Sequence, residues 1–342
     1  MRKTRFVFGF LVLCTLIGLA PSGLSLPGEA SAAEKIVFGL DWVPYGKYVG
    51  YYVARDKGFY KEAGFDVTFE RGYGGASTQV GNGNQQYGIE SVGGVVIARN
   101  KNVPVKLISM WHERLMMSVV VLKNSGIQTP KDLKGRKLGV TIGDAIHRNW
   151  PVFAERVGLK DWNFVPMDPA AKNPALLAKK VDGILTYATV TISLRVQAKK
   201  MGEEVVEFLF SDHGVRLAND GLIAHDKTIA EKPDQGRRFV AASLKGNAWA
   251  IEHPEEGVNV FLKYIPDASR EMTRFSWDLS SRFQVWGSLK EHGLGYMDRD
   301  MMESTRKTMA RVYKMQNPPP LDDLYTTKLL PKQLPKPKLP AM

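Results

Sequence analysis

The segment Asp41–Tyr48 holds residue types that can bind a flat organic molecule. Its sequence is Asp-Trp-Val-Pro-Tyr-Gly-Lys-Tyr, and it follows an apolar stretch, residues 34–40, that is typical of a β-strand. One indole and two phenol rings in a single loop can sandwich a planar ligand, and each stacked pair contributes about 0.5–1.5 kcal/mol beyond the area it buries. The alternative is that the indole belongs to the hydrophobic core. The candidate contacts in this loop are Asp41, Trp42, Tyr45 and Tyr48.

A glycine pair followed by hydroxyl residues forms a second candidate loop. The sequence Gly-Gly-Ala-Ser-Thr at residues 74–78 opens a predicted helix. Backbone N–H groups at such a turn, together with the hydroxyls, can donate hydrogen bonds to an anionic or carbonyl group of a ligand. The alternative is simple capping of the helix by the serine. The candidate contacts are Gly75, Ala76, Ser77 and Thr78.

Two further loops follow predicted strands at residues 87–89 and 103–110. The first, Ser-Val-Gly-Gly, has glycines that let the backbone approach a ligand closely, although a tight turn without a ligand explains the same pattern. The second, Trp-His-Glu-Arg, ends in a guanidinium that can grip a carboxylate or sulfonate with two parallel hydrogen bonds. An ion pair with Glu113 or another surface acid is the alternative. The candidate contacts are Ser91, Gly93, Trp111 and Arg114.

The remaining candidates lie near the middle of the chain. Gly-Asp-Ala-Ile-His at residues 143–147 opens a predicted helix and is similar to the glycine turn at residues 74–78. We expect it to close over the ligand from the opposite side. A tyrosine follows the predicted strand at residues 181–185. Lone histidines are more often surface or core residues than ligand contacts. The candidates are Asp144, His147 and Tyr187.

These loops need a scaffold in which strand ends meet helix starts. Predicted strands and helices alternate from residue 34 to 110, and the same alternation restarts between residues 137 and 185. Two successive units predict an α/β protein with two lobes and a cleft between them. Ligands of open α/β sheets lie beyond the carboxyl ends of the strands, which is where these loops fall. From residue 228 onward we expect mostly helices.

Both ends of the chain carry segments outside this scaffold. A basic start, an apolar run at residues 6–20 and a small-residue end at Ala30–Ala33 are typical of a secretory signal peptide, residues 1–32, cleaved after Ala32. The apolar run is shorter than the roughly 20 residues of a spanning helix. It contains Cys14, the only cysteine, so the mature chain would lack a thiol. The Lys/Pro-rich tail, residues 331–342, lacks an apolar face and is expected to be loosely ordered.

The formal net charge of +12 suits nucleic acid, an anionic membrane surface or an anionic solute. The lysines and arginines are spread along the chain, however, and no zinc-finger or RNA-binding motif is present. We therefore interpret the charge as solvated surface and expect no nucleic-acid partner. The sequence has no nucleophile elbow, zinc helix or P-loop, and none of its six histidines lies three or four residues from another. No catalytic residue, metal or cofactor is predicted.

Several motifs, in this order along the chain, resemble those of one large family, the periplasmic binding proteins for aliphatic sulfonates, taurine, nitrate and thiamine-type pyrimidines. They include Gly-Leu-Asp-Trp-Val-Pro at residues 39–44, Ala-Arg-Asp-Lys-Gly-Phe-Tyr at 54–60, Pro-Lys-Asp-Leu-Lys-Gly at 130–135 and Pro-Pro-Pro-Leu-Asp-Asp-Leu-Tyr at 318–325. With others between them, they cover nearly all of the chain after the signal peptide. The first and last are most similar to the thiamine-pyrimidine branch.

The resemblance implies a type II periplasmic binding protein, with two α/β lobes, two hinge strands and a small-molecule solute buried when the lobes close. It places the crossing into the second lobe near residues 119–122 and the return near residues 219–223. Lobe 1 then spans residues 34–120 and 220–330, and lobe 2 spans residues 121–219. The resemblance also implies a periplasmic monomer that delivers its solute to the permease and ATPase subunits of an ABC importer.

Two departures from the family pattern bear on the solute and on catalysis. Pyrimidine-binding members typically carry Asn where this chain has Tyr45 and His where it has Tyr48. The resemblance therefore does not decide whether the solute is pyrimidine-like or another aromatic or anionic molecule. One relative is a thiamine-pyrimidine synthase, which uses its own histidine, bound pyridoxal phosphate and a cysteine-rich iron motif. This chain has one cysteine and no histidine before His112. We therefore expect binding, with the synthase as the alternative.

Overall fold

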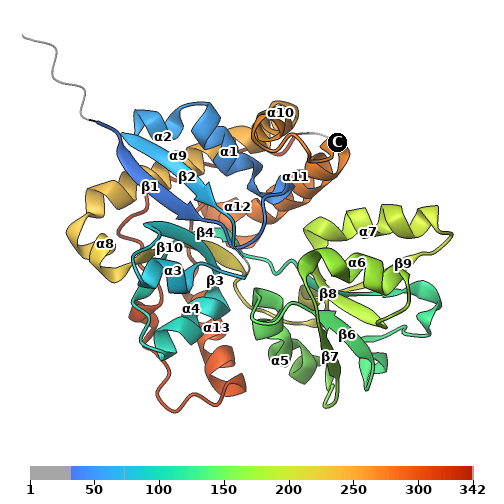
Figure 1. The fold of residues 1–342 in the computed structure, drawn as a ribbon. Coiled ribbons are helices and arrows are strands. Elements are labelled where there is room, and N and C mark those ends of the chain that lie inside the picture. Colours follow the sequence, from blue (N-terminus) through green and yellow to red (C-terminus); the bar gives the residue numbers. More distant parts are fainter. Residues whose placement is uncertain (1–31, 73, 341–342) are drawn as a thin grey trace, which may run out of the picture. The chain divides into compact units, whose positions relative to one another are not determined.

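The computed structural model describes residues 32–72 and 74–340, in which the strands form two separate five-stranded sheets (Figure 1). Helices lie against both sheets, and the α/β class predicted from the sequence is confirmed. The segment predicted as a signal peptide lies outside the described residues except for Ala32.

The first sheet has the strand order β2-β1-β3-β10-β4. Strand β1 runs parallel to β2 and β3, whereas β10 lies between β3 and β4 and runs antiparallel to both. The chain therefore returns to this sheet after a long excursion. The strands are β1 (Glu34–Gly39), β2 (Phe65–Glu70), β3 (Tyr87–Ser91), β4 (Val105–His112) and β10 (Asp220–His225).

The second sheet, with the order β7-β6-β8-β5-β9, repeats this topology. Strand β6 runs parallel to β7 and β8, and β5 lies antiparallel between β8 and β9. In each sheet, one antiparallel strand thus follows a crossing from the other sheet. The strands are β5 (Met117–Leu122), β6 (Lys137–Val140), β7 (Asn163–Pro166), β8 (Gly183–Tyr187) and β9 (Val205–Leu209).

Helices α5, α6 and α7 contact the second sheet, and α2, α3 and α4 contact the first (Figure 1). The expectation that helices dominate after residue 228 is confirmed. The α-helices are α1 (Val49–Asp56), α2 (Phe59–Glu62), α3 (Ser77–Gly81), α4 (Val92–Asn100), α5 (Ala145–Val157), α6 (Pro169–Leu177), α7 (Ala188–Lys200), α8 (Asp226–Glu231), α9 (Pro233–Glu252), α10 (Pro254–Tyr264), α11 (Arg270–Gln284), α12 (Gly287–His292) and α13 (Arg299–Val312).

The chain crosses between the sheets at residues 113–116 and returns between Leu209 and Asp220. The crossing expected at residues 119–122 instead lies inside β5, where Met117–Val121 pair with β8 and Ser118–Leu122 with β9. The lobe boundary expected at residue 120 divides the same strand. The reason is that β5 is buried along its whole length, so its apolar run contains no break that marks the crossing.

Side chains predicted as ligand contacts cap two of the helices. Ser91 Oγ accepts a hydrogen bond from Gly94 N of α4 at 3.0 Å, and Asp144 Oδ1 accepts one from His147 N of α5 at 2.7 Å. Such caps typically contribute about 1 kcal/mol to stability. Ser77, by contrast, is the first residue of α3, and no side-chain hydrogen bond caps that helix.

The expectation of a loosely ordered C-terminal tail is wrong for residues 331–340. Leu294 N donates a hydrogen bond to Pro335 O at 2.8 Å, and Lys338 N donates one to Glu252 Oε1 at 3.2 Å. Leu334 packs against the core of the first sheet, and Pro337 is buried. Composition did not predict this, because isolated apolar residues and backbone hydrogen bonds hold the segment without any periodic apolar face.

Phe239 of α9 lies at the centre of an aromatic cluster in the first-sheet core. Its fully buried ring stacks on Tyr87 at a centroid distance of 4.0 Å and meets the edge of Phe38 at 5.3 Å. We expect Phe239→Ala to lower the free energy of unfolding in urea by about 3–5 kcal/mol, because it leaves a cavity. The control Phe275→Ala removes a ring that is 49% exposed and should change it by about 0.5 kcal/mol or less. Equal effects would contradict this assignment.

Candidate ligand-binding site

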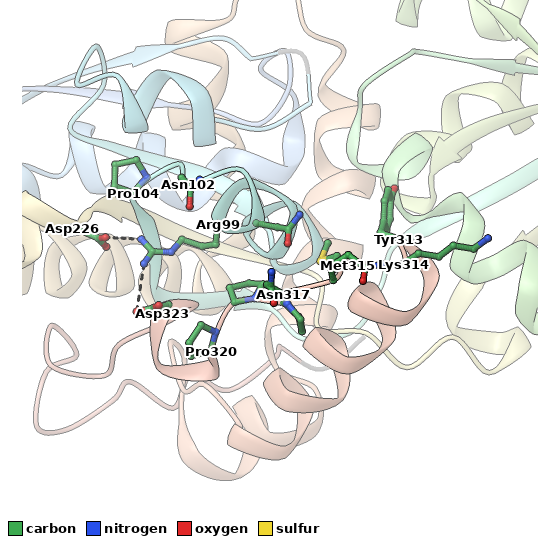
Figure 2. A pocket seen from close by; sticks show the side chains of 14 residues that line it. Arg99, Asn102, Pro104, Asp226, Tyr313, Lys314, Met315, Asn317, Pro320 and Asp323 are labelled. Atoms are coloured by element: carbon green, nitrogen blue, oxygen red, sulfur yellow. Dashed lines mark hydrogen bonds and ion pairs between the residues drawn. The ribbon is translucent and has the colours of Figure 1, made fainter.

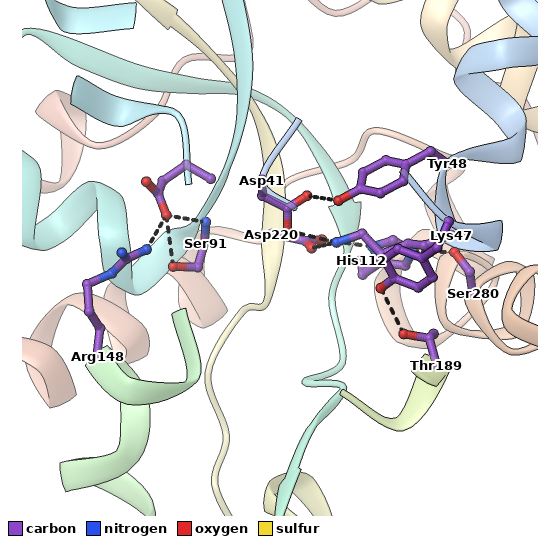
Figure 3. Close-up of polar contacts among 11 residues, drawn as sticks. Asp41, Lys47, Tyr48, Ser91, His112, Arg148, Thr189, Asp220 and Ser280 are labelled. Carbon is purple, nitrogen blue, oxygen red and sulfur yellow. Dashed lines mark hydrogen bonds and ion pairs between the residues drawn. The ribbon is translucent and has the colours of Figure 1, made fainter. Parts of the chain in front are cut away.

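Residues on the first-sheet side contact helices α5 and α7 on the second-sheet side through polar groups. The hydroxyls of Tyr45 and Thr189 lie 2.9 Å apart, and Ser276 Oγ donates a hydrogen bond to Thr189 O at 2.6 Å. At another point of the boundary, Arg148 Nη2 of α5 lies 2.7 Å from Glu90 Oε1 of β3. Figure 3 shows the side chains of Arg148 and Thr189 in these contacts. Residues from both sheets therefore build one continuous boundary.

A cavity of about 510 Å³ lies at this boundary. Trp42 lines it from the loop after β1, and Tyr187 lines it from the end of β8. Their ring centroids are 6.1 Å apart, with the planes at 64°. The volume lies within the roughly 300–1,000 Å³ of small-molecule sites, and an apolar aromatic lining is typical of them. The other lining residues include Arg71 and, from the second-sheet side, Lys172 and Val190.

Lys172 places a buried amine in the wall of this cavity. Its Nζ donates a hydrogen bond to Leu185 O at 2.8 Å and lies 5.6 Å from the ring centroid of Trp42. Burial lowers the pKa of Lys172, and the charge of Asp144 opposes that shift. Burial also raises the pKa of Asp144, whose Oδ2 is buried without a hydrogen-bond partner among the described residues. The second-sheet side thus retains capacity for polar contacts with a ligand.

A buried charge network lies beside the cavity, on the first-sheet side. Lys47 Nζ is 2.8 Å from Asp41 Oδ2 and 3.1 Å from Asp220 Oδ2, and the Lys47 side chain is only 1% exposed (Figure 3). Tyr48 Oη donates a hydrogen bond to Asp41 Oδ1 at 2.8 Å. His112 Nδ1 lies 2.7 Å from Asp220 Oδ1. Asp41 lies just after β1, His112 is the last residue of β4, and Asp220 is the first residue of β10. The network therefore connects the ends of three strands.

The pKa shifts in the network follow from burial and from the charged partners. Burial alone lowers the pKa of Lys47, but the carboxylates of Asp220 and Asp41 outweigh it and raise that pKa above its ordinary value. Burial raises the pKa of Asp220, but Lys47 and His112 outweigh it and lower the pKa to about 2. Burial lowers the pKa of His112, and the charge of Asp220 opposes that shift. Its Nδ1–H donates to the Asp220 carboxylate, and Nε2 shares a hydrogen bond with Ser280 Oγ at 2.9 Å.

Several of the predicted contacts lie at the boundary between the sheets. Trp42 and Tyr187 line the cavity, and Tyr45 reaches the second sheet. Gly75 approaches Glu90 so closely that a Cβ on this glycine would lie 2.2 Å from Glu90 Oε2. The backbone N–H groups of the predicted contacts Ser77 and Ser91 donate to the same carboxylate, at 3.4 and 2.9 Å.

Asp41, Tyr48 and Trp111 belong to the network and the core, not to the cavity wall. Tyr48 is fully buried, and its ring lies 5.4 Å from that of Tyr45 and 5.7 Å from that of Trp111. Trp111 Nε1 donates a hydrogen bond to Asn247 Oδ1 at 3.2 Å. The aromatic clamp predicted from the first loop therefore reduces, at the cavity, to Trp42.

The predicted contacts Ala76, Thr78 and Gly93 do not line the cavity. Ala76 is part of the hydrophobic core, and Thr78 is exposed. A Cβ on Gly93 would lie 2.8 Å from Asn149 Oδ1 and close to Met309, so this glycine permits the contact of α4 with α5 and α13. Packing within the protein therefore explains the residue types at Ala76 and Gly93.

His147 and Arg114 also have partners within the protein. His147 Nδ1 accepts a hydrogen bond from Gly143 N at 3.1 Å, and its ring meets that of Phe164. Arg114 Nη2 lies 2.6 Å from Asp212 Oδ1, so the acid that it pairs with is Asp212. Arg114 lines a different cavity, of about 760 Å³, together with residues such as Trp286.

Five charged residues near the boundary were not among the candidates predicted from the sequence: Lys47, Glu90, Arg148, Lys172 and Asp220. A weak signal was present for Glu90 and Asp220, because each is a carboxylate at the end of an otherwise apolar strand. Their partners could not be found this way, since each ion pair joins residues far apart in the sequence.

Another cavity, of about 910 Å³, lies near the end of α4 (Figure 2), and neither Trp42 nor Tyr187 lines it. Arg99 lines it and is held by Asp226 and Asp323, at 2.5 and 3.4 Å. Its size does not make it the better candidate, because Tyr313 is the single aromatic residue among the described residues that line it. In the part of the chain that the structure describes, no group of three or more His, Cys, Asp or Glu residues could hold a metal ion. No helix there could span a membrane.

Comparisons with known proteins agree with this architecture. The model of the family described as NMT1/THI5 like matches residues 46–257. The chain belongs to this family. The riboflavin-binding protein RibY of Chloroflexus aurantiacus is 24% identical over 323 residues, covering 91% of this chain and 90% of that protein. The formylaminopyrimidine-binding protein of Halalkalibacterium halodurans is 24% identical over 262 residues, covering 73% and 77%.

Other relatives within the NMT1/THI5-like family are enzymes. The 4-amino-5-hydroxymethyl-2-methylpyrimidine phosphate synthase of Schizosaccharomyces pombe is 21% identical over 294 residues, covering 79% of this chain and 84% of that protein. Among solved structures, the aliphatic sulphonate binding protein SsuA of Escherichia coli superposes with a TM-score of 0.64 at 14% identity, covering 90% and 96%. At that identity the match shows the fold, which is that of periplasmic binding proteins.

The buried network predicts a specific acid dependence of stability. Because the pKa of Asp220 is about 2 in the folded protein and about 3.9 in an unfolded chain, its contribution is present above about pH 4 and is lost as the pH falls toward 2. We expect Asp220→Asn to remove on the order of 2 kcal/mol of this acid-dependent stability, measured by urea unfolding between pH 2 and 6. The control Asp234→Asn changes an exposed carboxylate and should leave the profile intact. Identical profiles for wild type and Asp220→Asn would contradict the assignment.

Proposed function

We propose that this protein is an exported solute-binding protein that captures a small planar organic molecule between its two sheets and delivers it to an ABC importer. The observation that carries the proposal is the cavity of about 510 Å³ at the boundary of the sheets, in whose wall the rings of Trp42 and Tyr187 meet edge to face. A ring that enters this space can contact both aromatic side chains at once. The family membership and the binding functions for which RibY and the formylaminopyrimidine-binding protein are named support the same role.

Capture would proceed by closure of the two sheets around the solute. Contacts such as Tyr45–Thr189 and Glu90–Arg148 exist only when the sheets meet. A solute shifts the equilibrium toward this state only through contacts that it makes better there. The rings of Trp42 and Tyr187, one from each sheet's side, provide such contacts when they lie together in the cavity wall. The permease and ATPase subunits of the importer would then recognise surfaces that are adjacent only in the closed protein.

The synthase relatives make pyrimidine synthesis the alternative. Two observations favour binding. The sequence contains one cysteine, Cys14, which cannot by itself form a cysteine-rich iron motif. The first histidine of the chain, His112, is fully buried, and both ring nitrogens already have partners within the protein, Asp220 and Ser280. An imidazole held in this way is not available as a reactant.

A thermal-shift screen of the purified protein against pyrimidines, flavins, aromatic acids, sulfonates and nitrate tests solute capture. A solute at 100 times its dissociation constant stabilises the folded state by about 2.7 kcal/mol, which such a screen detects. For the solute found, we expect Trp42→Ala and Tyr187→Ala each to raise the dissociation constant by about tenfold, because each removes a ring contact.

The matched control for the ring variants is Trp249→Ala. Trp249 stacks on His253 in a different part of the protein and does not line the cavity. Unchanged affinity in both Trp42→Ala and Tyr187→Ala would contradict the aromatic site.

Export predicts a defined maturation step. We expect expression of the full chain in a bacterium with a periplasm to yield a periplasmic protein that begins at Ala33, because Ala30 and Ala32 form the small-residue cleavage pattern. Intact-mass measurement of the periplasmic fraction checks this, and Ala32→Lys is the variant that should block cleavage. A protein that keeps residues 1–32 and stays in the cytoplasm would contradict export.

A further inference from the structure

Lys172 is a buried cation in the wall of the cavity proposed for the solute. It lies in α6 with only 4% of its surface exposed, and it lines the cavity together with Trp42 and Tyr187. Lysines are almost never buried this deeply unless an anionic group pairs with them. Among the described residues, however, no carboxylate forms an ion pair with Lys172, and its hydrogen bond goes to the backbone oxygen of Leu185 at 2.8 Å. The cation therefore lacks the partner that its burial calls for.

The ammonium group retains donors that the described part of the chain does not satisfy. A lysine ammonium has three N–H donors, and here one of them binds Leu185 O. The contact of Nζ with the Trp42 ring, at 5.6 Å from its centroid, attracts the charge but supplies no hydrogen-bond acceptor. Because a buried donor without an acceptor costs free energy, an acceptor brought by a bound molecule would be favoured at this position.

Asp144 influences Lys172 without satisfying these donors. Burial lowers the pKa of Lys172, and the charge of Asp144 opposes that shift. Asp144 Oδ1 accepts its hydrogen bond from His147 N, and its Oδ2 has no hydrogen-bond partner among the described residues. Asp144 is also not among the residues that line the cavity. Its carboxylate thus helps to keep the amine protonated and leaves the cavity side of the amine to a ligand.

The other groups of the cavity wall favour an electron-rich solute group. Among the described lining residues, Arg71 and Lys172 are cationic, and Asp168 is the acid. Tyr187 is only 7% exposed, and no described residue forms a hydrogen bond with its hydroxyl, which is a further donor in this wall. Cations and O–H donors stabilise carbonyl and anionic oxygens, whereas an amine on the solute would meet like donors.

We propose that Lys172 binds an oxygen of the solute, either carbonyl or anionic, and thereby determines which ring molecules the protein accepts. Nζ and the Trp42 ring lie close together in one cavity wall, so a planar ring with an attached oxygen can contact both. Rings whose polar groups are amines alone leave the donors of Lys172 unsatisfied and bind more weakly. This inference rests on the proposed solute capture and narrows its solute class.

Three small probes with the same ring test the preference for oxygen. Benzoate carries an anionic carboxylate, benzamide a neutral carbonyl and aniline an amine, and each is titrated calorimetrically into the purified protein at constant ionic strength. We expect wild type to bind benzoate, benzamide or both about tenfold more tightly than aniline, because a charge-assisted hydrogen bond forms only with oxygen. Preference for benzoate alone assigns an anionic solute oxygen, and preference for benzamide as well assigns a carbonyl. Equal affinities, or tighter binding of aniline, overturn the proposal.

Substitution of Lys172 should remove this preference and leave ring binding in place. Lys172→Met keeps a side chain of similar length without charge or donors, and Lys172→Leu replaces it if the methionine variant does not fold. We expect the oxygen-bearing probes to lose about tenfold in affinity and aniline to change by about threefold or less. The matched control is Lys57→Met, because the Lys57 ammonium lies 4.3 Å from the Trp249 ring centroid and does not line the cavity. An equal loss in the control contradicts the proposal.

The outcomes separate this inference from the proposed function. A folded Lys172→Met or Lys172→Leu that keeps the wild-type preference overturns the role of Lys172, even where Trp42→Ala weakens all probes and so supports the aromatic site. Wild type that binds neither oxygen-bearing probe also overturns it, while the thermal-shift screen decides solute capture independently. If the Lys172 variants lose the preference but Trp42→Ala changes no affinity, the aromatic site alone fails. If neither Lys172 variant folds, the wild-type titration decides, because a preference for oxygen supports the proposal and its absence overturns it.

Discussion

The ammonium group of Lys47 lies between the carboxylates of Asp41 and Asp220, and the arrangement of the first sheet at the boundary depends on this contact. Isolated charges at such burial would cost several kcal/mol each, so none of the three is tolerable without the others. Asp41 follows β1, and Asp220 begins β10, the strand by which the chain returns from the second sheet. His112, which ends β4 just before the first crossing, is held by Asp220 in turn. The network therefore anchors both passages of the chain between the sheets.

Charge is divided unequally across the boundary. Buried carboxylates prevail on the first-sheet side, and Arg148 and Lys172 stand on the second-sheet side. Attraction between the sides favours their contact, while the aromatic rings of Trp42 and Tyr187 meet edge to face in the wall of the cavity. Polar contacts thus bring the sheets together beside a cavity whose lining combines aromatic and polar side chains. This division of roles is suited to a binding protein, which needs a defined closed state and no reactive group.

Local pattern predicted the elements well where one signal dominated. The strands expected at residues 34–40 and 87–89 are β1 and β3. The predictions failed where local pattern carries no information about partners. The run Met117–Leu122 is uniformly buried, so nothing in it marks the crossing between sheets. The prolines of the C-terminal tail resemble those of a disordered segment, yet single side chains and backbone groups fasten it to the first-sheet core.

The sequence by itself determined the α/β class, the loops at the strand ends and the family, because apolar periodicity, turn residues and ordered motifs are local properties of the chain. It also placed Trp42 and Tyr187 among the candidates for the site. Only the tertiary structure decided that Lys47 meets Asp220, 173 residues away, and that Glu90 meets Arg148 across the boundary. Whether a charged side chain faces water, a partner or a ligand depends on what packs against it, and burial makes that choice energetically decisive. For this reason the positions of the loops could be predicted from the sequence, whereas the partners of the charged side chains near them could not.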